Sequence, residues 1–235
     1  MKKNSSHYIC LVLLCLCFAW AEGQAQNIEW AGLQRYAQAN KELPQPGKKE
    51  KRVVFMGNSI TEWWVSQRPS FFTENNYIGR GIGGQTSYQF LLRFREDVIN
   101  LSPALVVINA GTNDVAENAG PYNEDYTFGN ILSMVELAQA HQIKVILTST
   151  LPAAAFGWNP RIKDAAAKIA SLNARVREYA EEHHIPYVDY YQAMVYGENK
   201  ALNPAYSNDG VHPTEEGYKV MEALIKPAIE RVLEP

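Results

Sequence analysis

Cysteine is scarce in this 235-residue sequence, and its distribution excludes several kinds of chemistry. The three cysteines, Cys10, Cys15 and Cys17, all lie in an apolar run between Tyr8 and Ala21. If that run is removed as a leader, the mature chain has no disulfide, no thiolate nucleophile and no cysteine-ligated metal. Neither Cys15 nor Cys17 follows the small residue that a lipoprotein processing site requires, so we expect no lipid anchor.

An excess of basic charge is also missing. Lysine and arginine total 22 against 25 acidic residues, and the basic residues form no long block. Because nucleic-acid-binding proteins use clustered Lys and Arg to neutralise phosphates, we expect no nucleic acid partner. With 46% hydrophobic and 20% charged residues, the composition is that of an ordinary globular chain.

Residues 1–25 have the pattern of a secretory signal peptide. Lys2 and Lys3 precede the apolar run, and small residues suited to cleavage end at Ala21 and Ala25. The run is shorter than the roughly 20 residues that span a bilayer, although a retained membrane anchor is the alternative interpretation. We therefore expect a secreted or periplasmic protein that has no stable membrane insertion after leader cleavage.

The rest of the chain divides into residues 26–52, an N-terminal helix and linker, and residues 53–235, one catalytic domain. Apolar residues recur at helical spacing from Ile28 to Tyr36. From Val53 onward, short β-branched runs alternate with helical segments, which is typical of βαβ units and a parallel sheet. We expect strands at 53–56, 77–81, 104–109, 144–148 and 186–189, and helices at 88–101, 125–141, 162–184 and 214–233.

Functional groups in such a sheet gather outside the carboxyl ends of the strands. The first strand leads into Gly57-Asn58-Ser59-Ile60-Thr61, where Ser59 is either a nucleophile or a helix N-cap. It does not sit in the α/β-hydrolase elbow, which needs Gly at position 61. The second strand leads into the loop Gly81-Ile82-Gly83-Gly84-Gln85-Thr86, whose N–H groups can approach an anion or carbonyl oxygen. This loop lacks the dinucleotide and phosphate-loop patterns, and the alternative is an ordinary turn.

Two further segments supply an amide and a possible base. Asn113 ends the stretch after the third strand, either as a hydrogen-bond donor or as a turn former. Asp209 and His212 are three residues apart, a spacing at which a carboxylate can orient an imidazole that activates a hydroxyl, unless the segment is only a surface turn. We interpret Asp114 and Asp189 as structural. No metal-binding pattern is recognisable, so we expect neither a metal nor a cofactor.

Taken together, the four segments resemble the SGNH hydrolases, also called the GDSL family of esterases and lipases, over residues 53 to about 233. The resemblance implies that Ser59 is the nucleophile and that His212 is the general base, oriented by Asp209. The implied oxyanion hole comprises Ser59, Gly84 and Asn113. The implied fold is a three-layer α/β/α sandwich with a five-stranded parallel sheet, flavodoxin-like in order.

One residue departs from the family pattern. Asn58 stands where the family name expects Asp, a change that leaves the mechanism intact and bears on turn geometry and local charge.

The implied reaction is ester hydrolysis through an acyl-enzyme. Short connecting segments without a lipase-like lid favour a small acyl group such as acetyl. The resemblance to a family that often acts on acetylated glycans, together with export, implies O-acetyl groups on carbohydrates by analogy. Trp158 and Trp63 are the candidate substrate-binding residues, although Trp63, with Trp64, Phe71 and Phe72, can equally pack under the first helix. The alternatives are a lysophospholipase or thioesterase and an inactive glycan-binding relative. The sequence leaves the oligomeric state open.

Overall fold

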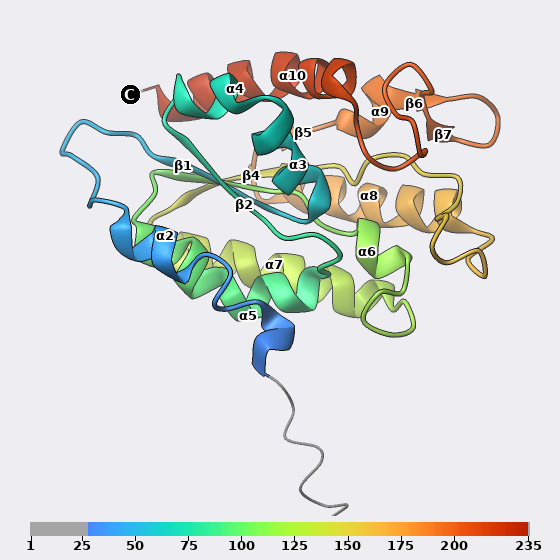
Figure 1. Ribbon diagram of the computed structural model, residues 1–235, viewed down its shortest axis with the longest axis horizontal. Coiled ribbons are helices and arrows are strands. Elements are labelled where there is room, and N and C mark those ends of the chain that lie inside the picture. The colour runs from blue at the N-terminus through green and yellow to red at the C-terminus, as the bar shows by residue number, and fades with distance from the viewer. Residues whose placement is uncertain (1–27, 235) are drawn as a thin grey trace, which may run out of the picture. The chain divides into compact units, whose positions relative to one another are not determined.

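Five parallel strands form the central sheet of the computed structural model, which describes residues 28–234 (Figure 1). The strands lie in the order β2-β1-β3-β4-β5, which is the flavodoxin-like order. Their bounds are β1 (Val53–Gly57), β2 (Tyr77–Gly81), β3 (Leu105–Ile108), β4 (Lys144–Thr148) and β5 (Tyr187–Val188). This confirms the predicted five-stranded parallel sheet, whereas the predicted signal peptide lies outside the described residues.

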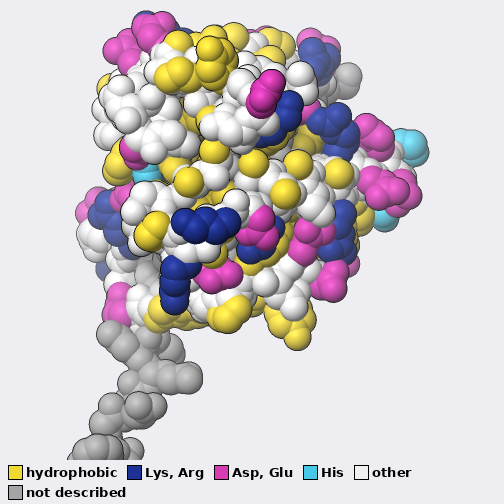
Figure 2. Space-filling view, turned by 90° about the vertical axis from the view of Figure 1, so that its right-hand side faces the viewer, with side chains coloured by type: hydrophobic (Ala, Val, Ile, Leu, Met, Phe, Trp, Pro, Cys, Tyr) yellow, Lys and Arg dark blue, Asp and Glu magenta, His cyan; other side chains and the backbone are white. Residues whose placement is uncertain are grey.

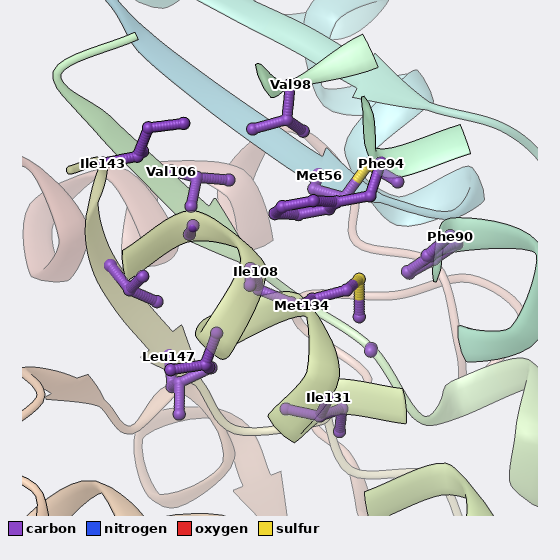
Figure 3. Close-up of a cluster of buried hydrophobic side chains, with 14 of the residues drawn as sticks. Met56, Phe90, Phe94, Val98, Val106, Ile108, Ile131, Met134, Ile143 and Leu147 are labelled. Carbon is purple, nitrogen blue, oxygen red and sulfur yellow. The ribbon is translucent and has the colours of Figure 1, made fainter. Parts of the chain in front are cut away.

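Helices cover both faces of the sheet because alternate strand side chains point to opposite sides. Val54 and Met56 of β1 join one buried cluster, and Val53 and Phe55 join the other. The first cluster, part of which Figure 3 shows, packs against helices α5 (Ser87–Asp97), α7 (Glu124–Ala140) and α8 (Ala165–Glu182). The second packs against α3 (Ser59–Gln67), α4 (Pro69–Thr73) and α10 (Glu215–Leu233). The molecule is therefore the predicted three-layer α/β/α sandwich.

Several short elements were not predicted. Helices α3 and α4 follow β1, and the four-residue α6 (Thr112–Val115) and five-residue α9 (Tyr190–Met194) follow β3 and β5. Strands β6 (Val195–Tyr196) and β7 (Ala201–Leu202) form a small antiparallel pair. The helix predicted at 88–101 ends earlier, as α5 at Asp97, and its last three residues form the 3-10 turn η3 (Ile99–Leu101) instead. Each of these elements, α3 excepted, is five residues or shorter, too short for its periodicity to stand out from a loop.

The single helix predicted to begin near Ile28 and to end before Leu43 is correct in its end but wrong in its continuity. The chain instead forms a 3-10 turn, η2 (Ile28–Ala31), and a separate helix, α2 (Ala37–Glu42). Gly32 has a φ of +68°, a left-handed conformation that a continuous right-handed helix does not contain.

The segment that contains α2 packs on the catalytic domain. The Tyr36 hydroxyl donates to the Gly81 carbonyl at the end of β2, and Asn40 Nδ2 donates to Asp97 Oδ1 at 2.7 Å. This segment therefore braces the loop that follows β2. None of the helices in residues 28–234 is long and apolar enough to cross a membrane.

Candidate active site

Ser59 lies at the junction between β1 and α3, at the carboxyl end of the sheet. Asn58 is the N-cap of α3, because its Oδ1 accepts a hydrogen bond from the Ile60 N–H at 2.9 Å. Ser59 is thus the first residue of the helix, and its hydroxyl is not used as a cap. A Cβ at position 57 would lie 2.0 Å from Thr61 Oγ1, which explains why Gly57 ends the strand.

His212 and Asp209 approach this serine from the loop before α10. The distance from Ser59 Oγ to His212 Nε2 is 2.8 Å, and that from His212 Nδ1 to Asp209 Oδ2 is 2.6 Å. The other carboxylate oxygen of Asp209 accepts the N–H groups of Val211 and His212 at 2.9 and 2.8 Å. The structure therefore joins three predicted site residues, separated by up to 153 positions, in one hydrogen-bonded row.

The surroundings of Asp209 favour its ionised form. Burial acts to raise the pKa of this carboxyl, but the N–H groups of His212 and Val211 and the His212 ring outweigh it. The result is a pKa of about 2, below the ordinary value of 3.8. Asp209 is thus an anion at neutral pH, which orients the imidazole and stabilises its protonated form.

Two exposed tryptophans lie beside the His212 ring. The Trp63 and His212 ring centroids are 4.2 Å apart, and those of Trp158 and His212 are 6.2 Å apart. Trp63 is 42% exposed and Trp158 is 48% exposed. The aromatic residues after Ser59 were expected either to line a substrate site or to pack in the core. Trp63 borders the site, whereas Trp64, Phe71 and Phe72 are buried in the core.

The glycine loop after β2 forms a turn from Ile82 to Gln85, closed by a Gln85 N–H to Ile82 carbonyl bond of 3.3 Å. Glu62 Oε2 accepts the Gly83 N–H at 2.8 Å. A Cβ placed on Gly83 would lie 3.8 Å from Ser59 Cβ, so the turn lies against Ser59. Gly84 has a φ of +76°, which favours glycine at this position.

Asn113 lies in α6 and contacts the same turn. Its Nδ2 donates to the Gln85 carbonyl at 2.9 Å, which uses one of the two amide hydrogens. Asn118, in the loop after α6, donates through Nδ2 to the Gly84 carbonyl at 3.1 Å. Gly84 and Asn113 therefore belong to one hydrogen-bonded unit.

A buried network supports the turn from beneath. Arg93 donates to the Gly57 carbonyl at 2.9 Å, to Gln85 Oε1 at 2.6 Å and to Asp97 Oδ2 at 2.8 Å. It thereby links the last residue of β1 to the glycine loop. The Gln85 Nε2 also donates to the Ala31 carbonyl at 2.9 Å.

Both strand-end aspartates outside the row have structural contacts. Asp114 accepts hydrogen bonds from the N–H and hydroxyl of Ser87 at the start of α5, and burial raises its pKa. Asp189 is the N-cap of α9 and accepts the Gln192 N–H at 3.0 Å.

Sequence reasoning missed two residues that contact the site. Glu62 is an acidic residue in the first turn of α3, a common feature of helices that does not by itself indicate a site. Asn118 belongs to no recognisable motif. Within residues 28–234, no three His, Cys, Asp or Glu side chains are grouped as a metal site would need.

A serine hydroxyl, an imidazole and a carboxylate joined in sequence on an α/β sandwich define a serine-hydrolase arrangement. The model of the GDSL-like Lipase/Acylhydrolase family matches residues 55–220. The chain belongs to this family, and the protein is a carboxylic ester hydrolase.

Solved structures of two Bacteroides proteins resemble this chain along most of its length. A candidate acylhydrolase from Bacteroides fragilis is 74% identical with a TM-score of 0.88, covering 88% of this chain and 100% of that one. A GDSL-like lipase from Bacteroides thetaiotaomicron is 73% identical with a TM-score of 0.87, covering 87% and 100%.

Two curated relatives are more distant. An acetylxylan esterase from Xylanibacter ruminicola is 23% identical over 227 residues, covering 81% of this chain and 45% of that protein. An uncharacterised lipoprotein from Bacillus subtilis is 35% identical over 78 residues, covering 32% of each. The chain thus spans less than half the length of these two relatives.

Proposed function

We propose that this ester hydrolase is exported and removes acetyl groups from carbohydrates, with Ser59 as its nucleophile. The observation that carries the proposal is the Ser59–His212–Asp209 row, bordered by two exposed indole rings. The row supplies the chemistry, and the rings supply a surface for a sugar.

The hydrogen-bonded row supports the following proton transfers. Ser59 Oγ attacks the acyl carbon while His212 Nε2 takes the hydroxyl proton, and His212 then returns that proton to the departing alcohol. Asp209 remains ionised and holds the Nδ1–H of the ring. A water molecule, activated by His212, then attacks the acyl-enzyme, which releases the acid and restores the Ser59 hydroxyl.

The negative charge on the tetrahedral intermediate needs donors that already point toward it. The N–H of Ser59 at the first position of α3, the N–H of Gly84 and the second Nδ2 hydrogen of Asn113 serve this role. Backbone N–H groups at a helix N-terminus also carry the positive end of the helix dipole. Such prearranged donors stabilise the intermediate without reorganisation during the reaction.

The surroundings of the row favour a neutral sugar ester. Aromatic rings present flat apolar faces that fit the C–H-rich faces of a pyranose, and binding sites are commonly lined this way. Figure 2 shows the right-hand side of the molecule in Figure 1, where α6 and the loop before α8 lie. Acidic and basic side chains are intermixed on this face. The curated acetylxylan esterase supports acetylated polysaccharide as the substrate class. The apolar leader and the lipoprotein relative support export.

The decisive experiment measures acetate release by purified residues 26–235 from acetylated xylan and other acetylated polysaccharides, with Ser59→Ala as control. We expect release by the unaltered protein and a loss on the order of a millionfold in the variant. Circular dichroism checks that the variant folds. An activity on 4-nitrophenyl esters that rises from acetyl to octanoyl, without acetate release from glycans, would instead support a lipid or thioester substrate.

A further inference from the structure

We infer that Asn118 is a positioning residue that couples the exposed Trp158 ring to the Gly84 N–H of the oxyanion hole. The inference rests on the proposed function, because it needs Gly84 as a donor and a sugar on Trp158. It extends that function by making the oxyanion hole respond to the part of the substrate that does not react.

Asn118 bridges the tryptophan and the glycine turn. The Trp158 Nε1–H donates to Asn118 Oδ1 at 2.9 Å, and Asn118 Nδ2 donates to the Gly84 carbonyl at 3.1 Å. An indole N–H can only donate, so Oδ1 must face Trp158 and Nδ2 must face Gly84. The backbone N–H of Asn118 also donates to the Asn113 carbonyl at 3.0 Å. One residue therefore contacts both proposed donors outside the nucleophile.

The space beside the Gly84 Cα is open, so no neighbouring side chain packs there to fix the two peptide units that flank it. A Cβ built on Gly84 would meet no atom within 4 Å, and glycine is free to adopt many backbone conformations. Besides the backbone bond from the Gln85 N–H to the Ile82 carbonyl, two side chains bond to the turn here: Glu62 accepts the Gly83 N–H, and Asn118 donates to the Gly84 carbonyl. The Gly84 carbonyl that Asn118 holds lies in the peptide plane after the Gly84 Cα, and the Gly84 N–H lies in the plane before it, so Asn118 acts on this N–H through the φ and ψ angles of one glycine.

The coupling depends on the substrate because both bridging residues are exposed. Asn118 is exposed and Trp158 is 48% exposed, so water competes for their hydrogen bonds in the free enzyme. A sugar stacked on Trp158 excludes that water, and a hydrogen bond is stronger in a less polar environment. The Trp158 ring is 6.2 Å from the His212 ring, so a sugar on Trp158 is also beside the reacting ester.

The test compares Asn118→Ala on two acetyl esters of different size. The small ester is 4-nitrophenyl acetate, and the large one is an acetylated xylo-oligosaccharide that can cover Trp158. We expect kcat to fall about tenfold on the oligosaccharide and about twofold on the aryl ester, with a smaller change in KM. A residue that only maintained the loop would lower kcat by the same factor on both esters.

A double-variant cycle tests whether the effect passes through Trp158. Trp158→Phe retains an aromatic ring and removes the N–H donor, so we expect Trp158→Phe with Asn118→Ala to be no slower on the oligosaccharide than Asn118→Ala alone. Trp63→Phe is the matched control, since it removes an indole that also borders His212 but has no hydrogen bond to Asn118. Its effect should multiply with that of Asn118→Ala.

Each remaining outcome overturns the inference in a recognisable way. Equal losses of kcat on both esters would make Asn118 a structural residue, and a rise in KM without a fall in kcat would make it a sugar contact only. Either result leaves the proposed esterase intact. If the unaltered protein hydrolyses 4-nitrophenyl acetate but no acetylated oligosaccharide, the carbohydrate substrate fails, and the coupling through Trp158 fails with it.

Discussion

Two polar assemblies lie at the carboxyl edge of the sheet, and they differ in their access to water. The Ser59–His212–Asp209 row runs from the buried Ser59 to the surface, where the Asp209 side chain is 50% exposed. The Arg93–Asp97 pair is beneath it, with both side chains almost fully buried. Both assemblies contact the strand-to-helix turn, the first through the Ser59 hydroxyl and the second through the Gly57 carbonyl.

This difference in burial separates chemistry from support. A charge at the surface changes its protonation state at little cost because water solvates both states. A buried charge must keep its partner, since an unpaired ion in the interior costs several kcal/mol. We therefore expect changes in the row to alter the rate and changes in the buried pair to alter the stability.

The buried pair gives the largest expected effect on stability. Arg93→Met removes the guanidinium from Asp97, Gln85 and Gly57 and should lower the free energy of unfolding by about 3–5 kcal/mol. Urea unfolding followed by circular dichroism measures this change. Arg95→Met on the same helix is the control, because Arg95 is exposed and should change the stability by no more than about 0.5 kcal/mol. If the two variants lost the same free energy of unfolding, the buried pair would contribute no more to stability than an exposed residue, and the comparison would fail.

Asn113 sharpens the comparison, because it donates to the carbonyl of Gln85, whose side chain accepts from Arg93 of the buried pair. Asn113→Ala removes one donor of the proposed oxyanion hole and should lower turnover about 100- to 1,000-fold while the protein still folds. Steady-state hydrolysis of 4-nitrophenyl acetate measures this loss. Asn130→Ala removes an asparagine that donates to the Ser87 hydroxyl, and we expect its turnover to remain within about twofold of the unaltered protein. A rate near that of the unaltered protein in Asn113→Ala would exclude this side chain from the hole.

The sequence predicts the sheet well because its strands are buried on both faces. Such strands appear as short β-branched runs, and the runs at 53–56 and 144–148 agree with β1 and β4 to within one residue. The row was also predictable in outline, because parallel strands deliver their carboxyl ends to one edge. The distances from His212 to Ser59 and Asp209 agree with that expectation, and the catalytic roles remain predictions.

The side chains that hold the site in place could not be predicted from the sequence, and the reason is physical. Arg93 lies within a segment correctly predicted as a helix, but periodicity does not tell which carbonyl its guanidinium will reach. Glu62 and Asn118 each contact the glycine turn through one side-chain hydrogen bond. The turn is distant from both in the sequence, so such a bond produces no spacing pattern that could be recognised. Asn58 shows how a departure from the family pattern is tolerated, since an Asn oxygen caps α3 as an Asp oxygen would.

The smallest expected effect concerns Asp209 and tests its exposure directly. Its pKa in the folded protein is about 2 against an ordinary value of 3.8, so ionised Asp209 stabilises the fold above about pH 4. This contribution is lost as the pH falls toward 2. Because the carboxylate is half exposed, we expect it to be worth less than about 1 kcal/mol.

Urea unfolding of the unaltered protein and Asp209→Asn at about pH 6 and about pH 3 measures this contribution. The stability difference between them should shrink at the lower pH, because protonation removes the charge that the variant lacks. The buried Asp114 should behave in the opposite sense: burial raises its pKa, so its protonation begins at higher pH and stabilises the fold as the pH falls. If Asp209→Asn lost several kcal/mol of stability, the row would itself be part of the support, and the division between the two assemblies would be wrong.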